Sequence, residues 1–468
     1  MRIKAINVYA SICLVLGMAA CYAILHYLYG VFTQPYFWDE LGVYSRSSMY
    51  LSEYGLSLLP DSVPDELSRG HPLLCPLYFG IAFKLFGCNP LTAHLAAAVL
   101  NAIGFLFVFA ILLKNTKPFV AVAATLAIFV QALFLSQSVL VLPEMPLMVM
   151  TLAAVYFYIN DKVWATALFT ILALQIKESA LILPFAFLAS ESLKQKKVFT
   201  KNNLYLFALP ILSFLLFIGI QKLQRGYFFY PLHTSLASSD PYYINERWQN
   251  FKQFFLYQQG HIYFVIALAL ILFMNLVLKF KSIPNIFKNK MSIYPIVVAG
   301  SIAFLVLNYF LSRYTLYFFV FVYIAFFLLA FNLLKDKQNL AYILALALAV
   351  LGIMNWNRNE DYTDIDFSYT QHIKSVQLAI DELNTDSFNN KTIGMDFPVS
   401  AVYWNSNNGF QLKGNHKMCP LYDSAYSKDF ILLSHPGNMA DTAKFKESYN
   451  FYKELRKGYA YCRIYKKK

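Results

Sequence analysis

The chain has 468 residues, of which 58% are hydrophobic and only 14% are charged. Soluble domains are about 45–50% apolar and about 25% charged, so a soluble protein of this composition would expose large apolar patches. The composition excludes an ordinary soluble protein and predicts a polytopic α-helical membrane protein. The net charge of +13 does not indicate a nucleic-acid partner, because the lysines cluster in short segments between apolar runs, as membrane topology requires.

The first apolar run, from about residue 5 to 29, predicts a retained membrane anchor. At about 1.5 Å per residue it is long enough to cross about 30 Å of hydrocarbon. Aromatic residues follow it instead of a small-residue cleavage site, as expected at a membrane interface. Ten further spans are predicted at 91–113, 118–138, 146–160, 163–177, 179–193, 203–221, 260–280, 291–311, 314–334 and 339–356. Alternatively, the two short spans at 163–177 and 179–193 form one broken element.

The lysine-rich segments predict the orientation of these spans. With about 11 transmembrane helices, every such segment falls on the side of Arg2 and Lys4, which places the N-terminus in the cytosol and the C-terminus outside. Residues 1–356 then form a membrane domain with an extracytoplasmic loop at 30–90. A further outer segment covers residues 222–259.

Residues 357–468 are far more polar and predict a small extracytoplasmic α/β domain. Helices are expected at 370–383 and 441–457, and strands at 392–397, 429–433 and the tyrosine-rich end of the chain. Two cysteines, Cys419 and Cys462, fall in this domain. An oxidising compartment would permit a disulfide between them, although the sequence does not decide whether it forms.

The loop at 30–90 contains the most informative residues. Asp39 and Glu40 follow the first span within an aromatic belt, at the depth of lipid headgroups. A carboxylate at that depth can take a proton from a hydroxyl group, with Glu40 in support. Alternatively, the two acids simply end the first helix in water. His71 comes later in the loop, as a substrate contact or an interface histidine, and Lys84 lies on a short helix expected in the membrane interface.

Four further charged residues fall at the outer ends of predicted spans, on the face that holds Asp39: Glu144, Lys177, Glu178 and Arg313. Ionisable groups at membrane depth are costly and are therefore functional candidates. Arg313, Lys177 and Lys84 are candidates for binding a phosphate. The alternatives are snorkelling to the interface, a Lys177–Glu178 pair, and a Glu144 that only stabilises a helix N-terminus.

Several short motifs occur in a characteristic order, namely Trp38-Asp39-Glu40, His71-Pro72-Leu73-Leu74, Phe83-Lys84-Leu85-Phe86-Gly87, Leu142-Pro143-Glu144-Met145, Ile176-Lys177-Glu178 and Ser312-Arg313-Tyr314. Over about 350 residues this set resembles the GT-C membrane glycosyltransferases, in particular the protein O-mannosyltransferases and the lipid A aminoarabinose transferase. The second proline of the family's His-Pro-Pro-Leu motif is replaced here by Leu73. The resemblance implies that Asp39 is the catalytic base.

The same resemblance implies a polyprenyl-phosphate-linked monosaccharide as donor, bound among membrane lipids. It also implies an acceptor hydroxyl on a lipid, glycan or protein, and an active site on the periplasmic side of the inner membrane. Inversion at the anomeric carbon is expected, with the phosphate held by Arg313 together with Lys177 or Lys84. No glycine-rich nucleotide-binding loop is present. The spacing of Asp39, Glu40 and His71 fits no recognised metal site, and the cofactor stays open.

Three other functions compete with this interpretation. A flippase or transporter for lipid-linked glycans would suit many spans and intramembrane charges, but transporters often contain paired repeats, and no repeat is found. A polysaccharide polymerase or ligase would use a diphosphate-linked oligosaccharide. A purely structural scaffold gives no reason for ionisable groups gathered on one face.

Overall fold

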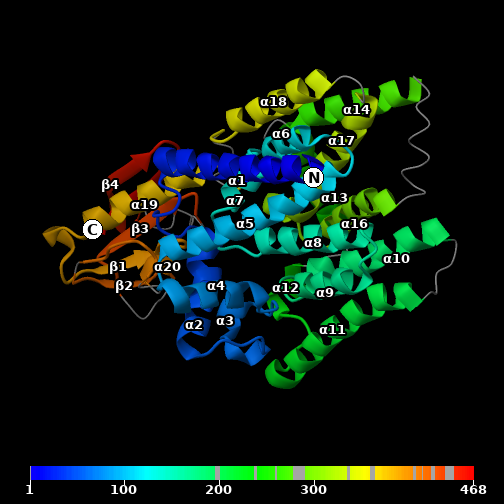
Figure 1. Cartoon of the computed structure of the whole chain (residues 1–468). Coiled ribbons are helices and arrows are strands. Elements are labelled where there is room, and N and C mark those ends of the chain that lie inside the picture. The colour runs from blue at the N-terminus through cyan, green and yellow to red at the C-terminus, as the bar shows by residue number, and fades with distance from the viewer. Residues whose placement is uncertain are drawn as a thin grey trace.

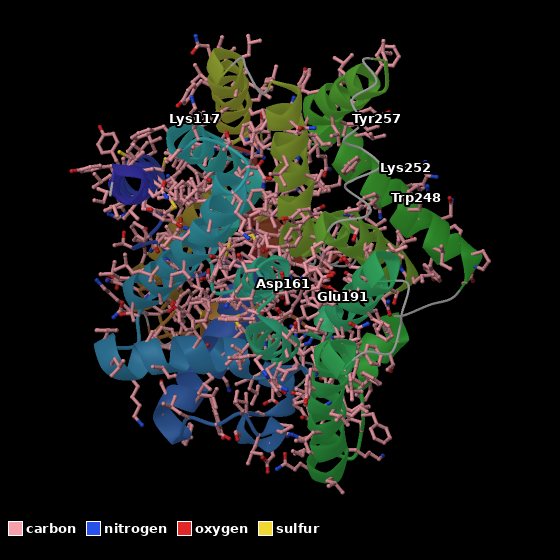
Figure 2. The ribbon with its side chains drawn as sticks, turned by 45° about the vertical axis from the view of Figure 1, so that its right-hand side comes forward. Lys117, Asp161, Glu191, Trp248, Lys252 and Tyr257 are labelled. Atoms are coloured by element: carbon pink, nitrogen blue, oxygen red, sulfur yellow. The ribbon has the colours of Figure 1, made fainter. Side chains whose placement is uncertain are left out.

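The computed structural model describes residues 2–195, 201–236, 240–258, 261–277, 290–334, 338–358, 364–403, 407–413, 415–422, 427–437 and 447–468. A bundle of apolar helices makes up most of the molecule, and a small domain with a sheet lies at one end of it (Figure 1). The end of the bundle away from the sheet carries the turns at Lys117 and Asp161, which Figure 2 brings toward the viewer. The orientation of these ends relative to the cytosol stays a prediction.

Each predicted span coincides with a helix or, in one case, with two. The helices are α1 (Arg2–Tyr29), α5 (Pro90–Leu113), α6 (Pro118–Phe129), α7 (Ala132–Gln137), α8 (Glu144–Ile159), α9 (Val163–Leu174), α10 (Ile182–Gln195), α11 (Lys201–Arg225), α14 (His261–Val277), α16 (Ile293–Leu307), α17 (Leu316–Leu333) and α18 (Gln338–Met354). Four apolar helices in the described ranges are long enough to cross a membrane: Ile6–Tyr29, Pro90–Leu113, Asn203–Arg225 and Ser312–Asn332. The exact number of spans stays a prediction.

The predicted span at 118–138 is broken between α6 and α7. Gln131 has an extended backbone at the break, and its side-chain amide donates hydrogen bonds to the carbonyls of Ala127 at 2.6 Å and Leu348 at 2.9 Å. The buried amide is thereby satisfied, and it also binds α6 to α18. The apolar composition of this segment gave no sign of the break.

Further elements, most of them short, connect the long helices of the bundle. In the first loop these are η1 (Glu40–Tyr44), α2 (Ser45–Tyr54), η2 (Pro60–Ser62), α3 (Asp65–Ser68) and α4 (Leu74–Phe86). Beyond it lie η3 (Glu178–Leu181), α12 (Pro231–Leu236), α13 (Pro241–Tyr257), η5 (Lys290–Ser292) and η6 (Ser312–Thr315). The short helix predicted around Lys84 is confirmed as α4. It packs closely on α2, because a Cβ at Gly80 would lie only 3.1 Å from the Ser48 carbonyl.

The C-terminal domain contains α19 (Tyr369–Leu383), η7 (Asp386–Phe388), β1 (Thr392–Met395), α20 (Val399–Tyr403), β2 (Lys417–Pro420), β3 (Phe430–His435), β4 (Tyr449–Lys457) and β5 (Ala460–Lys467). The strands form one sheet in the order β2-β1-β3-β5-β4. β1 is parallel to β2 and β3, whereas β5 is antiparallel to β3 and β4. The predicted helix at 370–383 and the strands at 392–397, 429–433 and the end of the chain are confirmed.

One expectation for this domain is wrong, and the structure also answers the open question of a disulfide. The described part of the predicted helix at 441–457 is strand β4, which pairs with β5 through a turn at Gly458, where φ is +60°. Residues 441–446 lie outside the described residues. Cys419 and Cys462 form no disulfide and lie in β2 and β5, which are separated by two strands. Three strand spacings amount to about 14 Å, far beyond the reach of a disulfide.

The C-terminal domain packs on the loop that follows α1. The ring of Tyr29 stacks on Phe367 with centroids 4.8 Å apart, and the side-chain amide of Gln34 donates to the Tyr369 hydroxyl at 3.0 Å. The Tyr36 amide donates to the Asn408 carbonyl at 3.0 Å. The loop is therefore held between the membrane helices and the sheet domain.

Candidate active site

A cavity of about 900 Å³ lies where the helical bundle meets the C-terminal domain. Its walls are of two kinds. One is ionic and contains Asp39, Arg69, His71, Glu144, Lys177, Glu178, His233, Arg313 and Asp364. The other is apolar and contains Leu147, Leu181, Phe217, Ile218, Phe304, Leu305 and Leu311. The ionic wall includes six of the sequence-predicted residues: Asp39, His71, Glu144, Lys177, Glu178 and Arg313.

Arg313 is at the centre of the ionic wall. It lies in η6, immediately before α17, and only 8% of it is exposed. Its guanidinium group donates to the Asp39 carboxylate and, at 2.7 Å, to the Asp364 carboxylate. Its Nε lies 3.8 Å from Glu144 Oε1, and this Nε has no hydrogen-bond partner among the described residues. Arg313 thus joins carboxylates from three distant segments, and its Nε–H group is buried beside Glu144.

The Asp39 carboxylate lies between two guanidinium groups, that of Arg313 and that of Arg69, whose Nη1 is 3.7 Å away. Burial by itself would raise the pKa of Asp39. The charge of Arg313 and its hydrogen bond, followed by the charges of Arg69 and Lys177, outweigh burial and hold the pKa below its usual value. Asp39 is therefore ionised at neutral pH and can accept a proton.

Trp38 sets the direction of Asp39. Its φ of +46° lies in the left-handed region, which a bulky residue rarely adopts, so the surrounding structure must stabilise this turn. The indole ring packs edge-on against Phe397 at a centroid distance of 5.2 Å and against His372 at 6.3 Å. The C-terminal domain thus contacts the residue that precedes Asp39, and its Pro436 also lines the cavity.

Lys177 and Glu144 form a second buried ion pair in the ionic wall. The Lys177 ammonium group donates to Glu144 Oε1 at 2.8 Å and lies 3.5 Å from the ring centroid of Tyr314. Glu144 is the first residue of α8 and is 1% exposed; its Oε2 has no hydrogen-bond partner in the described part of the chain. The predicted Lys177–Glu178 pair does not form, because Glu178 turns toward His71 instead.

The other end of the ionic wall contains Glu178, His71 and His233. Nδ1 of His71 lies 3.0 Å and 3.2 Å from the two carboxylate oxygens of Glu178. The ring centroids of His71 and His233 are 4.6 Å apart. Burial opposes ionisation of Glu178, but the charge and hydrogen bond of His71 lower the pKa of Glu178 to about 2. Burial, and then the charge of His71, lower the pKa of His233 to about 4. Within the described ranges, no three His, Cys, Asp or Glu side chains are arranged to hold a metal ion.

Two predicted site residues lie outside the cavity. Glu40 is 1% exposed, and its carboxylate accepts hydrogen bonds from the backbone of Phe37 and Val141 and contacts His94, so it has no oxygen left for a substrate. Lys84 is exposed on α4, whose inward face contains Phe79 and Phe83 instead. The arrangement does not bring Glu40 or Lys84 to a bound substrate.

Three residues of the ionic wall had no predicted role: Arg69, His233 and Asp364. Arg69 and Gly70 have φ values of +48° and +69°, and this left-handed turn places Arg69 and His71 in the same cavity. The neighbouring His71 was a signal that could have identified Arg69. His233 and Asp364 lie in connecting segments without a recognisable motif, and only tertiary packing brings them to the site.

No model of a known protein family matches the chain, and no curated protein sequence matches it either. The crystal structure of ArnT from Cupriavidus metallidurans bound to undecaprenyl phosphate aligns with a TM-score of 0.52 at 10% identity, over 96% of this chain and 97% of that chain. ArnT in the apo state aligns with a TM-score of 0.51 at 9% identity and the same coverage.

A weaker likeness is to the Archaeoglobus fulgidus oligosaccharyltransferase in complex with Zn and sulfate, with a TM-score of 0.45 at 12% identity, over 86% of this chain and 64% of that chain. The likeness to ArnT extends over almost the full length of both chains and includes the helical bundle and the C-terminal domain. The chain is therefore a membrane protein with the fold of ArnT.

Proposed function

We propose that this protein is a glycosyltransferase that moves a monosaccharide from a polyprenyl-phosphate donor to a hydroxyl group of an extracytoplasmic acceptor. The observation that carries this proposal is the cavity itself. It combines an ionised carboxylate, three cationic side chains and an apolar wall in one space of about 900 Å³. Undecaprenyl phosphate, which is bound in the ArnT crystal structure, combines the matching chemistry of a long apolar chain and an anionic headgroup.

The apolar wall suits the isoprenoid part of such a donor. Phe217 and Ile218 come from α11, and Phe304 and Leu305 come from α16. Removing apolar surface from water contributes about 25 cal/mol per Å², so an isoprenoid chain along this wall would supply much of the binding free energy. The reacting headgroup would then lie at the ionic wall.

The cations of the ionic wall suit the phosphate. Arg313 can hold two phosphate oxygens with its planar guanidinium group, whereas Lys177 acts as a compact point charge. Each already interacts with a carboxylate, since Arg313 contacts Asp39 and Asp364, and Lys177 contacts Glu144. These carboxylates preorganise the cations in the absence of a ligand. An arriving phosphate would take over the contact that Arg313 makes with Asp39.

The reaction is a single displacement. Asp39 takes the proton of the acceptor hydroxyl, whose oxygen forms a bond to the anomeric carbon from the side opposite the phosphate. The bond between that carbon and the phosphate oxygen breaks, and its electron pair leaves with polyprenyl phosphate, which Arg313, Lys177 and Arg69 stabilise. The configuration at the anomeric carbon is inverted. The proton on Asp39 is later lost to water. His71 and Glu178 lie where they can contact the sugar or the acceptor.

The site is proposed to face the periplasm at the inner membrane, because the predicted topology places the loop at 30–90 and the C-terminal domain outside the cytosol. The acceptor is a hydroxyl group of a lipid, a glycan or a protein. Pro436 of the C-terminal domain lines the cavity, so this domain is in a position to contribute to the acceptor side.

Two measurements test the proposal. Native mass spectrometry of the purified protein in nanodiscs should detect bound undecaprenyl phosphate and much weaker binding of undecaprenol, which lacks the phosphate. Mass spectrometry of surface glycans from cells with and without the gene should then show the loss of one monosaccharide. Equal binding of both lipids, or intact glycan precursors accumulating in the cytosolic leaflet as a flippase defect would produce, would contradict the proposal. Loss of a whole oligosaccharide would indicate a polymerase or ligase.

A further inference from the structure

Glu40 lies next to the proposed base in the sequence but points away from the cavity. Its Oε1 lies 3.0 Å from Nε2 of His94 on α5 and accepts the Val141 amide at 2.9 Å. Its Oε2 accepts the Phe37 amide at 3.1 Å. Both members of the Glu40–His94 pair are completely buried. Burying an ionisable pair costs desolvation free energy, which the attraction between its members often does not repay. The position of this pair beside Asp39 therefore calls for a physical reason.

His94 holds both ends of the loop that carries Asp39. One ring nitrogen, Nδ1, lies 3.3 Å from the Phe32 carbonyl, and the other, Nε2, contacts Glu40. The ring of Tyr36 packs edge-on against the imidazole at 5.6 Å. A single side chain of α5 therefore fixes the start and the end of the segment at 32–40. The left-handed turn at Trp38 lies inside this segment.

Glu40 also links the loop to the ionic wall. The Val141 amide belongs to the segment that leads into α8, and Glu144, the partner of Lys177, begins that helix three residues later. Glu40 thus sets the spacing between Asp39 on one segment and Glu144 on another. Near-attack geometry is sensitive to such spacing, since a displacement of about 1 Å can lower turnover about 100-fold.

We propose that Glu40 and His94 act together as positioning residues, which hold the Trp38–Asp39 turn so that the Asp39 carboxylate lies between Arg313 and Arg69. The inference rests on the proposed role of Asp39 as the base. It assigns to Glu40 no contact with substrate, because Glu40 does not line the cavity and its carboxylate is fully engaged. His94 would affect catalysis only indirectly, by holding the backbone of the segment at 32–40 in place.

The test compares Glu40→Gln, His94→Gln and the double variant with Glu53→Gln, a matched control on the exposed side of α2 in the same loop. Glutamine keeps the size of glutamate but replaces one accepting oxygen with an N–H donor. Three quantities are measured: binding of undecaprenyl phosphate, the rate of glycan formation in complemented cells, and hydrogen exchange of a peptide that covers residues 37–44.

For Glu40→Gln and His94→Gln we expect undecaprenyl phosphate affinity within about twofold of the wild type. Glycan formation should fall about 10- to 100-fold, and amide exchange at residues 37–44 should become faster. The double variant should be no more than about twofold worse than the worse single variant, because both residues act through one contact. Glu53→Gln should match the wild type in all three measurements.

Unchanged turnover and exchange in Glu40→Gln would overturn the proposal, and so would multiplicative losses in the double variant. If Glu40→Gln were as inactive as Asp39→Asn while exchange at residues 37–44 stayed slow, Glu40 would take part in the chemistry itself. Should Glu40→Gln fail to fold, His94→Asn provides the same three measurements from the other partner. A wild type that binds no undecaprenyl phosphate would contradict the proposed function, whereas the exchange data would still test the positioning contact.

Discussion

The two ends of the ionic wall differ in the kind of charge that they carry. At one end, Arg313 joins Asp39 and Asp364, and a guanidinium group keeps its charge at every physiological pH. At the other end, Glu178 lies against His71, whose ring is next to that of His233. An imidazole can gain or lose its charge as the pH changes, and the pKa of His233, lowered by burial to about 4, places that change below neutral pH. The difference suggests that the arginine end serves the phosphate and the proton transfer, whereas the histidine end responds to pH.

The largest expected effect is that of Asp39→Asn. Removing a positioned general base lowers turnover by about 100- to 10,000-fold, so glycan formation should almost disappear. Binding of undecaprenyl phosphate should be as tight as in the wild type or tighter, because Arg313 loses a competing carboxylate. Glycan mass spectrometry and lipid binding by native mass spectrometry test both parts. Near-normal glycan formation would remove Asp39 from the role of base.

Arg313→Ala should weaken undecaprenyl phosphate binding about 10- to 100-fold, since a charge-assisted hydrogen bond contributes about 1.5–3 kcal/mol. It should also lower stability, because Asp364 is left as a buried carboxylate without the guanidinium group of Arg313, and breaking a buried ion pair in this way typically costs about 3–5 kcal/mol. Arg313→Lys keeps the charge but not the planar geometry, so its lipid affinity and stability should lie between those of the wild type and of Arg313→Ala. Thermal unfolding and lipid binding are the measurements.

Lys84→Ala is the matched control for Arg313, because Lys84 is exposed on α4 outside the cavity. It should bind undecaprenyl phosphate as the wild type does. A loss of lipid binding comparable to that of Arg313→Ala would show that α4 reaches the lipid headgroup. Arg313 would then not be the only cation that binds the phosphate.

The smallest effect concerns the histidine end. Burial lowers the pKa of His233 to about 4, so the unfolded chain, with a usual value near 6.5, takes up a proton before the folded protein does. Stability should therefore decrease as the pH falls from about 6.5 to about 4. His233→Gln should unfold with a weaker dependence on pH across this window. An identical pH dependence in both proteins would contradict the neutral, buried state of His233.

Glu178 contributes in a lower window, because its pKa is lowered to about 2. The stabilisation is complete above the usual value near 4.5 and is lost as the pH falls toward 2. The two contributions are separable, since His233→Gln leaves the acid window of Glu178 in place.

The helical bundle was predictable because hydrophobic runs and lysine-containing turns repeat along the chain. The same signal could not reveal the break at Gln131, which depends on a contact with Leu348 far along the chain. Strand β4 was mistaken for a helix, because its aromatic residues are followed by Lys453, Glu454 and Arg456, and such a mixture also suits an amphipathic helix. Its pairing with β5 decides the structure.

The candidate site was predictable where charges occur at the ends of apolar spans, as for Asp39, Glu144 and Arg313. Charge at a span end does not say which way a side chain points, so Glu40 and Lys84 were included with the cavity residues although neither lines it. Asp364 was missed because two helices, α17 and α18, separate it in the sequence from its partner Arg313, which it meets only in the folded protein.

The central claim is that a lipid phosphate binds at Arg313 beside Asp39. A cryo-electron microscopy structure of the protein with undecaprenyl phosphate tests it most directly. We expect the phosphate within hydrogen-bonding distance of Arg313, with the isoprenoid chain along Phe217 and Phe304 and with Asp39 released from the guanidinium group. A phosphate bound elsewhere, with the contact between Arg313 and Asp39 intact, would contradict it.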